Sequence, residues 1–350
     1  MRITIVGPGI IDIPPKGWGA TEILINDHAS KLREFGHKIT IVNEKNCDLR
    51  NKAIKKSNPD IIHLHYEKYL DNLDVNPDID IYLTSHYPYT DQYIKYANYF
   101  TNKKIYLLFS LFIKLIPKRL ILFFRFNEVL LSLFIYYPIF KKIINFQHNK
   151  KLICLSDRIL STYKFYGCKN DLFLSHNFVN EKSIAYEKNN FEPYAICLGK
   201  IESRKNQSKL KNIPCLFFAG PIADKNFSEN NFNYIGEWTR EMLYKSLTKY
   251  STLVLLSKGE AHALVICEAL VAGLGLVISE EASSNLDKNK EFIDIISIKH
   301  LNNTSYIEKI IKKNIIKSSL LRDEIREYGL NKFSLKNFQF SYPPIVNKNR

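Results

Sequence analysis

Short apolar runs rich in β-branched residues alternate with helix-like stretches in the first quarter of the chain. Four of these runs are predicted as strands: residues 2–6, 38–42, 61–65 and 81–85. Between the first two runs, residues 22–35 place apolar side chains at helical spacing, and Gly36 follows at the position of a C-terminal helix cap. A strand, a helix and a further strand in this order predict a parallel sheet with helices on both faces.

The same pattern starts again after a polar stretch at residues 181–193. Four further runs are predicted as strands: residues 194–199, 215–220, 252–257 and 274–279. Helical spacing appears at about residues 264–272 and again from Ile307 to Glu327. The chain is therefore predicted to be an α/β protein with two doubly wound domains. Its expected parts are residues 1–185, residues 186–330 and a polar tail at 331–350, for which packing back on the first domain is one option.

The size and composition agree with two folded domains. A chain of 350 residues exceeds the length at which one core usually stops growing, and 45% hydrophobic with 24% charged residues is typical of a globular protein. The net charge of +15 suggests an anionic partner, such as a phosphate-bearing ligand, a membrane surface or nucleic acid. A biased nucleotide composition that enriches Lys, Asn and Ile together is the alternative explanation. Because no nucleic-acid-binding motif is recognisable, we expect no nucleic-acid partner.

Cysteine usage and the N-terminus indicate the cellular compartment. The six cysteines form no CxxC pair, and most lie in apolar runs, as buried thiols do in a reducing compartment. The chain begins with the strand-like run at residues 2–6 and lacks the pattern of a secretory signal. We therefore expect a cytoplasmic protein.

Residues 101–146 combine basic and aromatic side chains. The longest uncharged run, Val129 to Phe140, has twelve residues, whereas a membrane-spanning helix needs about 20. Such a composition is typical of amphipathic helices on the surface of an anionic membrane, here the inner face. A helical part of the first domain with ordinary buried faces is the alternative. The residues expected at the membrane surface are Lys114, Lys118, Arg119, Arg125, Phe134, Tyr136, Tyr137, Lys141 and Lys142.

Open α/β sheets bind ligands at the carboxyl ends of their strands, so the loops after the strands are the places to search. The first such loop, residues 7–22, contains Gly17 and Gly19 and leads into a helix N-terminus, which favours an anion. Its spacing matches neither GxGxxG nor GxxxxGK[ST], which disfavours a dehydrogenase or an NTPase. A flexible connection without a binding role is the alternative.

Three histidines lie in or directly after predicted strands of the first domain. His86 directly follows the strand at 81–85, and this position makes it a candidate for the site. A structural hydrogen bond is the commoner role of a lone histidine. His63 and His65 share one strand face, but no third metal ligand is evident, so we expect core residues and no metal site.

Charged residues follow the predicted strands of the second domain. Lys200, Arg204 and Lys205 bring three cations to one strand end, which suits a diphosphate, with a solvated turn as the alternative. Glu260 and Glu268 flank an apolar segment, where buried carboxylates are costly unless they accept hydrogen bonds. Ribose or sugar hydroxyls would supply the donors, and the amides at the start of the intervening helix would bind a phosphate.

The order of these motifs resembles that of family 4 glycosyltransferases. The segment EAHALVICEALVAGLGLVIS, residues 260–279, is similar to the E-x7-E signature of that family. The likeness runs from residue 1 to about 300, through PPKGWGATE, PDIIHLH, SHYPY, CLSDRIL, LSHNFVN, LGKIESRKNQ, LFFAGP and YIGEW, and is nearest to the subgroup beginning PPxxGGTE. It implies the GT-B architecture, in which the N-terminal Rossmann-like domain receives the acceptor and the C-terminal one holds a nucleotide sugar. It also implies metal-independent transfer with retention of configuration and no cofactor.

The resemblance also implies roles for individual residues. The expected catalytic residues are His86, Glu260 and Lys205. Lys200 and Lys205 would neutralise the diphosphate, with Arg204 beside them, while Glu268 would hold the ribose and Glu260 the transferred sugar. The other expected donor contacts are Gly17 and Gly19 of the first loop and the backbone amides of His262, Ala263 and Leu264.

Three departures from the family pattern stand out. Lys200 replaces the usual Arg and loses its bidentate fork. Phe178 occupies a position where glycine is usual, so the geometry of that turn is open. Ala261, His262 and Ala263 replace Gly-Phe-Gly, which leaves the identity of the sugar more open than the activity.

The resemblance therefore implies a retaining glycosyltransferase that uses a nucleotide diphosphate sugar and a glycan or lipid-linked acceptor. Cell-surface polysaccharide or glycolipid synthesis at the cytosolic face of a membrane is the expected setting. A GT-B enzyme of another type, namely a nucleotide-sugar epimerase or a phosphorylase, is one alternative. A non-catalytic sugar- or membrane-binding homologue is the other.

Overall fold

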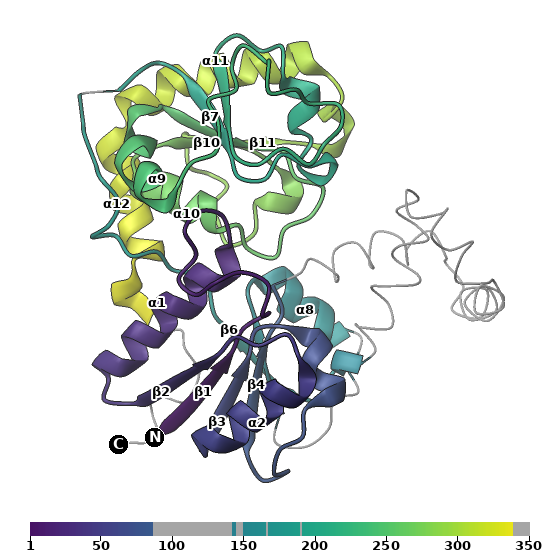
Figure 1. Ribbon diagram of the computed structural model, residues 1–350. Coiled ribbons are helices and arrows are strands. Elements are labelled where there is room, and N and C mark those ends of the chain that lie inside the picture. The colour runs from purple at the N-terminus through teal and green to yellow at the C-terminus, as the bar shows by residue number, and fades with distance from the viewer. Residues whose placement is uncertain (87–141, 145–149, 166, 190, 339–350) are drawn as a thin grey trace, which may run out of the picture.

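The computed structural model describes residues 1–86, 142–144, 150–165, 167–189 and 191–338. These residues form two α/β domains, the second above the first in Figure 1, and each is built on a parallel sheet. The predicted fold class is confirmed.

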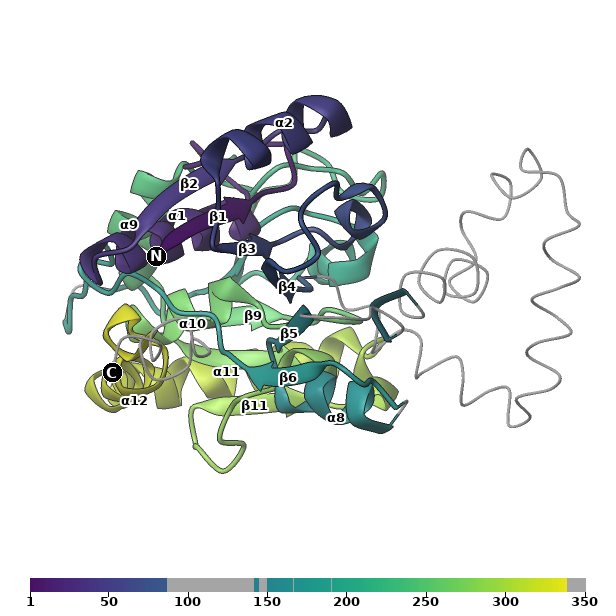
Figure 2. The same cartoon turned by 90° about the horizontal axis from the view of Figure 1, so that it is seen from below.

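The sheet of the first domain has, within the described residues, six parallel strands in the order β2-β1-β3-β4-β5-β6. Figure 2 shows them in this order from top to bottom. The strands are β1 Arg2–Val6, β2 Lys38–Val42, β3 Ile61–Leu64, β4 Asp80–Thr84, β5 Lys150–Cys154 and β6 Asp171–Leu174, and the helices are α1 Ala20–Glu34, α2 Cys47–Ser57 and α8 Asp157–Phe165. The chain leaves β1 toward β2 on one side and later returns to β3 on the other. The loop after β1 therefore lies at a topological switch point, where such sheets bind ligands.

The sheet of the second domain has five described strands in the order β11-β10-β9-β7-β8. They are β7 Ala195–Leu198, β8 Leu216–Ala219, β9 Thr252–Leu255, β10 Gly275–Ser279 and β11 Ile293–Ile296, with helices α9 Arg240–Ser246, α10 Leu264–Val271 and α11 Thr304–Leu320. The order reverses at β7, so the loops after β7 and β9 lie side by side at a second switch point. Nearly every residue of α10 is buried, which explains its continuous apolar sequence.

The predicted helix from Ile307 to Glu327 is instead two helices. α11 ends and α12, Arg322–Phe333, begins around Leu321. The buried guanidinium of Arg322 donates to the carbonyl oxygens of Thr248 at 2.7 Å and Tyr250 at 2.9 Å, which holds this turn. These partners lie more than 70 positions away in sequence, so helical periodicity alone could not indicate the break.

The chain then returns to the first domain, as the yellow helix α12 shows in Figure 1. Val179 and Ser334 form a parallel β-bridge, and Phe338 is buried in the core of the first domain. Phe178 packs edge-on against Phe338, with the ring centroids 6.2 Å apart. Phe178, one of the departures from the family pattern, therefore anchors the return of the chain to the first domain.

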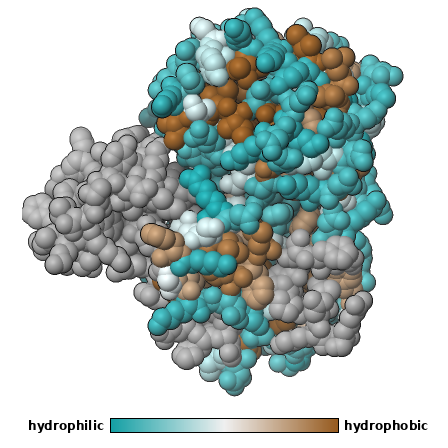
Figure 3. Space-filling view, turned by 180° about the vertical axis from the view of Figure 1, so that it is seen from behind, coloured by the Kyte–Doolittle hydropathy of each residue, from teal (hydrophilic) through white to brown (hydrophobic). Residues whose placement is uncertain are grey.

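The membrane prediction rests mainly on residues outside the described part of the chain. Among the residues named for it, Lys142 is described and exposed, whereas Lys114, Lys118, Arg119, Arg125, Phe134, Tyr136, Tyr137 and Lys141 are not described. No described helix has both the length and the apolar character to cross a bilayer. Seen from behind, both domains show hydrophobic patches separated by hydrophilic residues (Figure 3).

Candidate active site

A cavity of about 430 Å³ lies between the two domains. This volume falls in the range of about 300–1,000 Å³ that is typical of small-molecule sites. The first domain contributes the loop before α1 to the cavity wall. The second domain contributes the ends of β7 and β8 and the start of α10. Every residue predicted for catalysis or donor binding lines the cavity: Gly17, Gly19, His86, Lys200, Arg204, Lys205, Glu260, His262, Ala263, Leu264 and Glu268.

The loop before α1 contacts the second domain directly. The carbonyl oxygen of Lys16 accepts a hydrogen bond of 3.3 Å from the backbone N–H of Arg240. The ammonium of Lys200 lies 5.7 Å from the ring centroid of the exposed Trp18, within cation–π range. Ile23 and Leu24 of α1 continue this contact because they belong to the apolar core of the second domain. The first loop and helix therefore close one side of the cavity.

Glycines at the ends of β7 and β8 make room for Lys205. Gly199 has a φ of 110°, and a Cβ built on it would lie 3.1 Å from Nζ of Lys205. Gly220 has a φ of 137°, and its Cβ would come within 2.4 Å of the Gly199 carbonyl oxygen. Side chains at either position would strain the backbone and crowd the strand end. The absence of side chains at these two glycines thus leaves space for the Lys205 ammonium at the strand end, beside the cavity.

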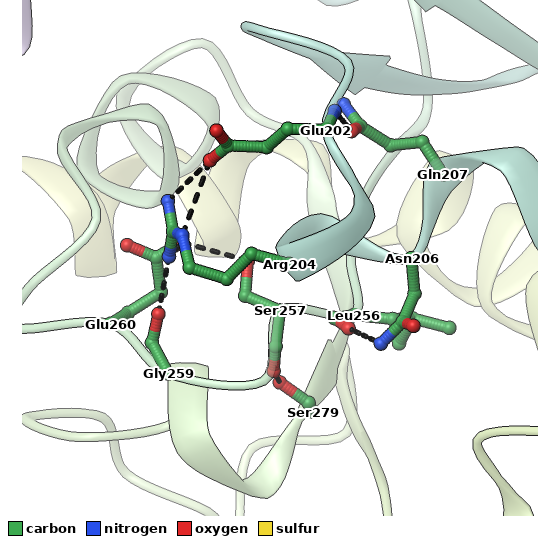
Figure 4. Close-up of polar contacts among 9 residues, drawn as sticks. All are labelled: Glu202, Arg204, Asn206, Gln207, Leu256, Ser257, Gly259, Glu260 and Ser279. Carbon is green, nitrogen blue, oxygen red and sulfur yellow. Dashed lines mark hydrogen bonds and ion pairs between the residues drawn. The ribbon is translucent and has the colours of Figure 1, made fainter. Parts of the chain in front are cut away.

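The turn after β7 is tied to the loop after β9 (Figure 4). Asn206 adopts the left-handed conformation, and its side-chain amide donates to the Leu256 carbonyl oxygen at 2.7 Å. The hydroxyl of Ser279 donates to the Ser257 carbonyl oxygen at 2.6 Å. In the same region, the guanidinium of Arg204 forms ion pairs with the carboxylates of Glu202 and Glu260. Arg204 therefore lines the cavity as predicted, but two carboxylates already surround its guanidinium.

Glu268 is buried on α10 and accepts a hydrogen bond from Nη2 of Arg240. The same nitrogen donates to the hydroxyl of Tyr244 at 2.8 Å. Burial raises the pKa of Asp27, on α1 of the first domain, to about 6, while the nearby Arg240 lowers it and Glu268 raises it. Arg240 and Glu268 therefore line the cavity as a pair, and the carboxylate of Asp27 lies near that pair.

The N-terminus of α10 faces the cavity without a side-chain cap. Ala263 is the N-cap and makes no side-chain hydrogen bond, so the first amides of the helix are not capped by its side chain. Such amides and the positive end of the helix dipole form a favourable site for a phosphate. The predicted role of this helix start is thus compatible with its geometry.

His86 belongs to a cluster of histidines that includes His28, His63 and His65. His86 Nε2 and His65 Nδ1 share a hydrogen bond of 2.7 Å, and His63 Nε2 lies 2.8 Å from the hydroxyl of Thr84. Burial lowers the pKa of His86 to about 4 and of His28 to about 3, so both rings are neutral at pH 7. Among the described residues, no group of three or more potential ligands is arranged to hold a metal ion.

The sequence did not point to three residues of this region. Arg240 pairs with Glu268, Asp27 lies beside that pair, and Asn177 hydrogen-bonds the segment before α10. A buried glutamate requires a cation or a hydrogen-bond donor beside it, and this requirement was the sequence signal that such a residue as Arg240 exists. Nothing local identifies which of the fifty Lys and Arg residues supplies it.

Comparison with known proteins identifies the fold. No protein-family model matches the sequence, and no curated protein matches it. The architecture is the GT-B fold. The structure is similar to the sucrose-phosphate synthase of Thermosynechococcus elongatus, with a TM-score of 0.67, 13% identity and 96% of each chain covered.

Two further structures extend the likeness. One is HepE of Anabaena in complex with UDP and glucose, with a TM-score of 0.64, 10% identity and 97% of each chain covered. The other is WaaG, a glycosyltransferase involved in lipopolysaccharide biosynthesis, with a TM-score of 0.62, 11% identity and coverage of 99% of this chain and 100% of WaaG. At these identities the likeness establishes the shared fold.

Proposed function

We propose that this protein is a retaining glycosyltransferase of the family 4 type, which moves a sugar from a nucleotide diphosphate sugar to a glycan or lipid-linked acceptor. One observation carries the proposal. The cavity between the domains gathers three glutamates, two lysines and an uncapped helix N-terminus. This set matches the chemistry of such a donor, which has a diphosphate between two groups rich in hydroxyls. The complexes of HepE with UDP and with UDP-glucose support a nucleotide-sugar donor and make uridine conjugates the first to test.

The cations and amides would hold the diphosphate. Lys200 and Lys205 approach from the end of β7, and the first amides of α10 lie across the same cavity. Glu268 would accept hydrogen bonds from the ribose, and Glu260 from the transferred sugar. Gly17 and Gly19 would bring backbone close to the donor from the other domain.

The proposed reaction replaces one bond at the anomeric carbon. The carbon–oxygen bond to the diphosphate breaks, and its electron pair stays on the leaving phosphate oxygen. The acceptor hydroxyl attacks from the same face, and its proton passes to that phosphate oxygen. Negative charge grows on the diphosphate in the transition state, so fixed cations and helix amides stabilise the transition state more than the ground state. In this scheme these groups supply the charge stabilisation, and no step calls on a metal ion or a cofactor.

His86 would serve the reacting centre from the first domain. It directly follows β4, lines the cavity and is neutral at pH 7 because burial lowers its pKa to about 4. A neutral imidazole offers one donor and one acceptor, and the bond to His65 occupies Nε2. Nδ1 is then the nitrogen that can hydrogen-bond a substrate hydroxyl.

The acceptor side of the proposal draws on the sequence. The basic and aromatic residues at 101–146 favour contact with an anionic membrane, where a lipid-linked acceptor would be found. WaaG, with the same fold, is involved in lipopolysaccharide biosynthesis, which supports a role in the synthesis of a surface glycan.

The test begins with donor binding by the purified full-length protein. UDP-, GDP-, ADP- and dTDP-sugars are screened for thermal stabilisation, since a ligand that binds only the folded state raises the melting temperature. Conjugates that bind are then incubated with acceptor glycans or lipid extracts, and nucleoside diphosphate release is measured. Stabilisation by a nucleotide sugar with acceptor-dependent release of the diphosphate is the expected result. Release of the nucleoside diphosphate with orthophosphate as the only acceptor would indicate a phosphorylase. Conversion of the nucleotide sugar without release of the diphosphate would indicate an epimerase. Binding of the nucleotide sugar without conversion would indicate a non-catalytic homologue.

A further inference from the structure

Arg204 lies at the cavity wall between two carboxylates (Figure 4). Its Nε and Nη2 both donate to Oε1 of Glu202, at 3.2 Å and 2.9 Å. Its Nη1 donates to Oε1 of Glu260 at 3.1 Å and to the carbonyl oxygen of Gly259. All three guanidinium nitrogens are therefore used within the protein.

The backbone reinforces this side-chain arrangement. The carbonyl oxygen of Arg204 accepts a hydrogen bond of 2.9 Å from the N–H of Lys258. The hydroxyl of the fully buried Ser257 donates to Oε1 of Glu260 at 2.7 Å, so Ser257 and Arg204 hold the same carboxylate oxygen. With two donors on Oε1, the other oxygen is the one expected to receive a sugar hydroxyl.

The charges distinguish Arg204 from the neighbouring lysines. One guanidinium between two carboxylates leaves no surplus positive charge for a diphosphate. In the part of the chain that the structure describes, no carboxylate lies within ion-pairing distance of Lys200 or Lys205. The side chains of Arg204 and Glu260 are 28% and 15% exposed, so water screens their pairing less than at an open surface.

We propose that Arg204 is a positioning residue that acts on the transferred sugar through Glu260 and does not bind the diphosphate. This inference rests on the proposed function and deepens it by separating the cations of the site into two groups. Lys200 and Lys205 neutralise the diphosphate, whereas Arg204 sets the orientation of the Glu260 carboxylate, which hydrogen-bonds the transferred sugar. The planar fork of arginine suits this task because one rigid group spans Glu202, Gly259 and Glu260 at once, which a lysine ammonium cannot do.

The experiment compares nucleoside diphosphates with their sugar conjugates. Binding of UDP, GDP, ADP and dTDP, and of their glucose, galactose, mannose and N-acetylglucosamine conjugates, is measured by calorimetry on the full-length wild-type protein. The best-bound conjugate and its parent diphosphate are then used with Arg204→Gln, Glu260→Gln, the double variant and the contrast variant Lys205→Gln. Turnover of the same conjugate is recorded alongside.

The expected pattern separates the two groups of cations. Arg204→Gln leaves the affinity for the parent diphosphate within about twofold and lowers conjugate affinity or turnover about tenfold, the scale of one charge-assisted hydrogen bond. Glu260→Gln shows the same pattern, and the double variant is no worse than either single one because both changes remove one function. Lys205→Gln instead weakens the diphosphate and the conjugate alike.

Two results would overturn the inference while leaving the proposed function in place. One is a loss of parent-diphosphate affinity in Arg204→Gln as large as that in Lys205→Gln. The other is wild-type conjugate binding and turnover in Arg204→Gln. If the wild-type protein binds no diphosphate and no conjugate, the proposed function fails and the inference fails with it.

Arg204→Lys guards against a folding artefact. The melting temperature of each unliganded variant is measured first, since Arg204→Gln leaves two carboxylates without their cation. The lysine variant keeps the charge but lacks the fork, so it should fold like the wild type, bind the parent diphosphate normally and recover only part of the sugar-dependent loss. Full recovery would show that charge alone suffices and would overturn the positioning role.

Discussion

Asn177 and His262 join the two domains beside the cavity. The backbone N–H of Asn177 donates to Nδ1 of His262 at 2.9 Å, and the side-chain amide of Asn177 donates to the His262 carbonyl oxygen at 2.7 Å. Both residues are buried. Because Nδ1 accepts, the proton of the neutral ring lies on Nε2, and burial lowers the pKa of His262 to about 3. The His262 side chain thus serves the domain junction, while its backbone lies at the start of α10.

Replacing His262 by Ala should destabilise the protein. The change leaves the buried Asn177 N–H without its acceptor and opens a void beside Phe333, whose ring centroid lies 5.5 Å from that of His262. We expect the free energy of unfolding in urea to fall by about 2–4 kcal/mol. The control is His300→Ala, which removes a partly exposed ring from Tyr306 and should change it by less than about 0.5 kcal/mol. Equal effects of the two variants would contradict a stabilising junction.

Replacing Glu268 by Gln should weaken donor binding about tenfold, because an amide accepts the ribose hydroxyls less strongly than a carboxylate. The glutamine preserves the volume of a buried side chain and can still accept from Arg240. Calorimetry with the best-bound nucleotide sugar measures the effect, with the exposed Glu280→Gln as the matched control. Wild-type affinity in the Glu268 variant would mean that the ribose binds elsewhere.

Replacing Gly199 by Ala should reduce both stability and donor affinity. The new Cβ would crowd Nζ of Lys205 at 3.1 Å, and the φ of 110° is strained for alanine. Gly36→Ala is the matched control, because Gly36 also has a positive φ, 81°, but its Cβ would meet no atom within 4 Å. Both variants should lose about 1–2 kcal/mol of unfolding free energy, whereas only the Gly199 variant should bind the diphosphate more weakly. Equal donor affinities would show that Lys205 does not depend on this glycine.

Acid should unfold the protein through its buried histidines. Burial lowers the pKa of His28 and of His262 to about 3 and that of His86 to about 4. Unfolded histidines have a pKa near 6.5, so below about pH 6.5 the unfolded state binds more protons and the unfolding free energy falls as the pH falls. Each such histidine contributes up to about 1.4 kcal/mol per pH unit. Asp27 has the opposite effect on the unfolding free energy over roughly pH 4 to 6. Because burial raises its pKa to about 6, Asp27 is protonated in the folded state and ionised in the unfolded state over this range, so its contribution to stability increases as the pH falls.

The variant His28→Phe tests this pH dependence. Phenylalanine can pack against Phe338 as the imidazole does, at a centroid distance of 4.9 Å in the wild type, but it does not titrate. In urea unfolding measured between about pH 4.5 and 8, the dependence of the unfolding free energy on pH should be smaller in the variant by up to about one proton below about pH 6, and the same as in the wild type near pH 8. An unchanged slope would mean that His28 is protonated equally in both states.

Replacing Phe134, Tyr136 and Tyr137 by Ser should reduce sedimentation with anionic vesicles. These residues lie outside the described part of the chain, and the prediction rests on the basic and aromatic composition of residues 101–146. Aromatic groups buried at the interface add to the attraction between lysines and anionic lipids. Phe232→Ser, at an exposed aromatic of the second domain, should bind like the wild type. Equal sedimentation of both variants would contradict interfacial binding.

Much of the framework follows from local patterns. β1 and β2 have the predicted bounds, because five-residue β-branched runs between polar turns have few other ways to be buried. The predicted site residues share one cavity because parallel strands bring the loops at their carboxyl ends to one edge, and two such edges face each other here. Order along the chain and strand direction were sufficient for this part.

Only the tertiary structure decided which groups meet. Glu268 pairs with Arg240, and Arg204 lies between Glu202 and Glu260. Whether a cation is free for a phosphate depends on which carboxylates the fold brings within a few ångströms of it. Glu202 is a near neighbour of Arg204 in sequence, but Arg204 and Glu260 are 56 positions apart and Arg240 and Glu268 are 28 positions apart.

The same distinction explains the C-terminal part of the chain. Helical periodicity extended across Leu321, but the buried bonds of Arg322 end one helix and begin the next. Phe178 looked like an anomaly in the sequence, and its meaning appeared only when Phe338 was found against it. The sequence determined the elements and the loops that bear the chemistry because these depend on neighbours along the chain. The partners of each charge and the crossing between domains were decided by packing, because burial and pairing energies depend on distances that exist only in the folded molecule.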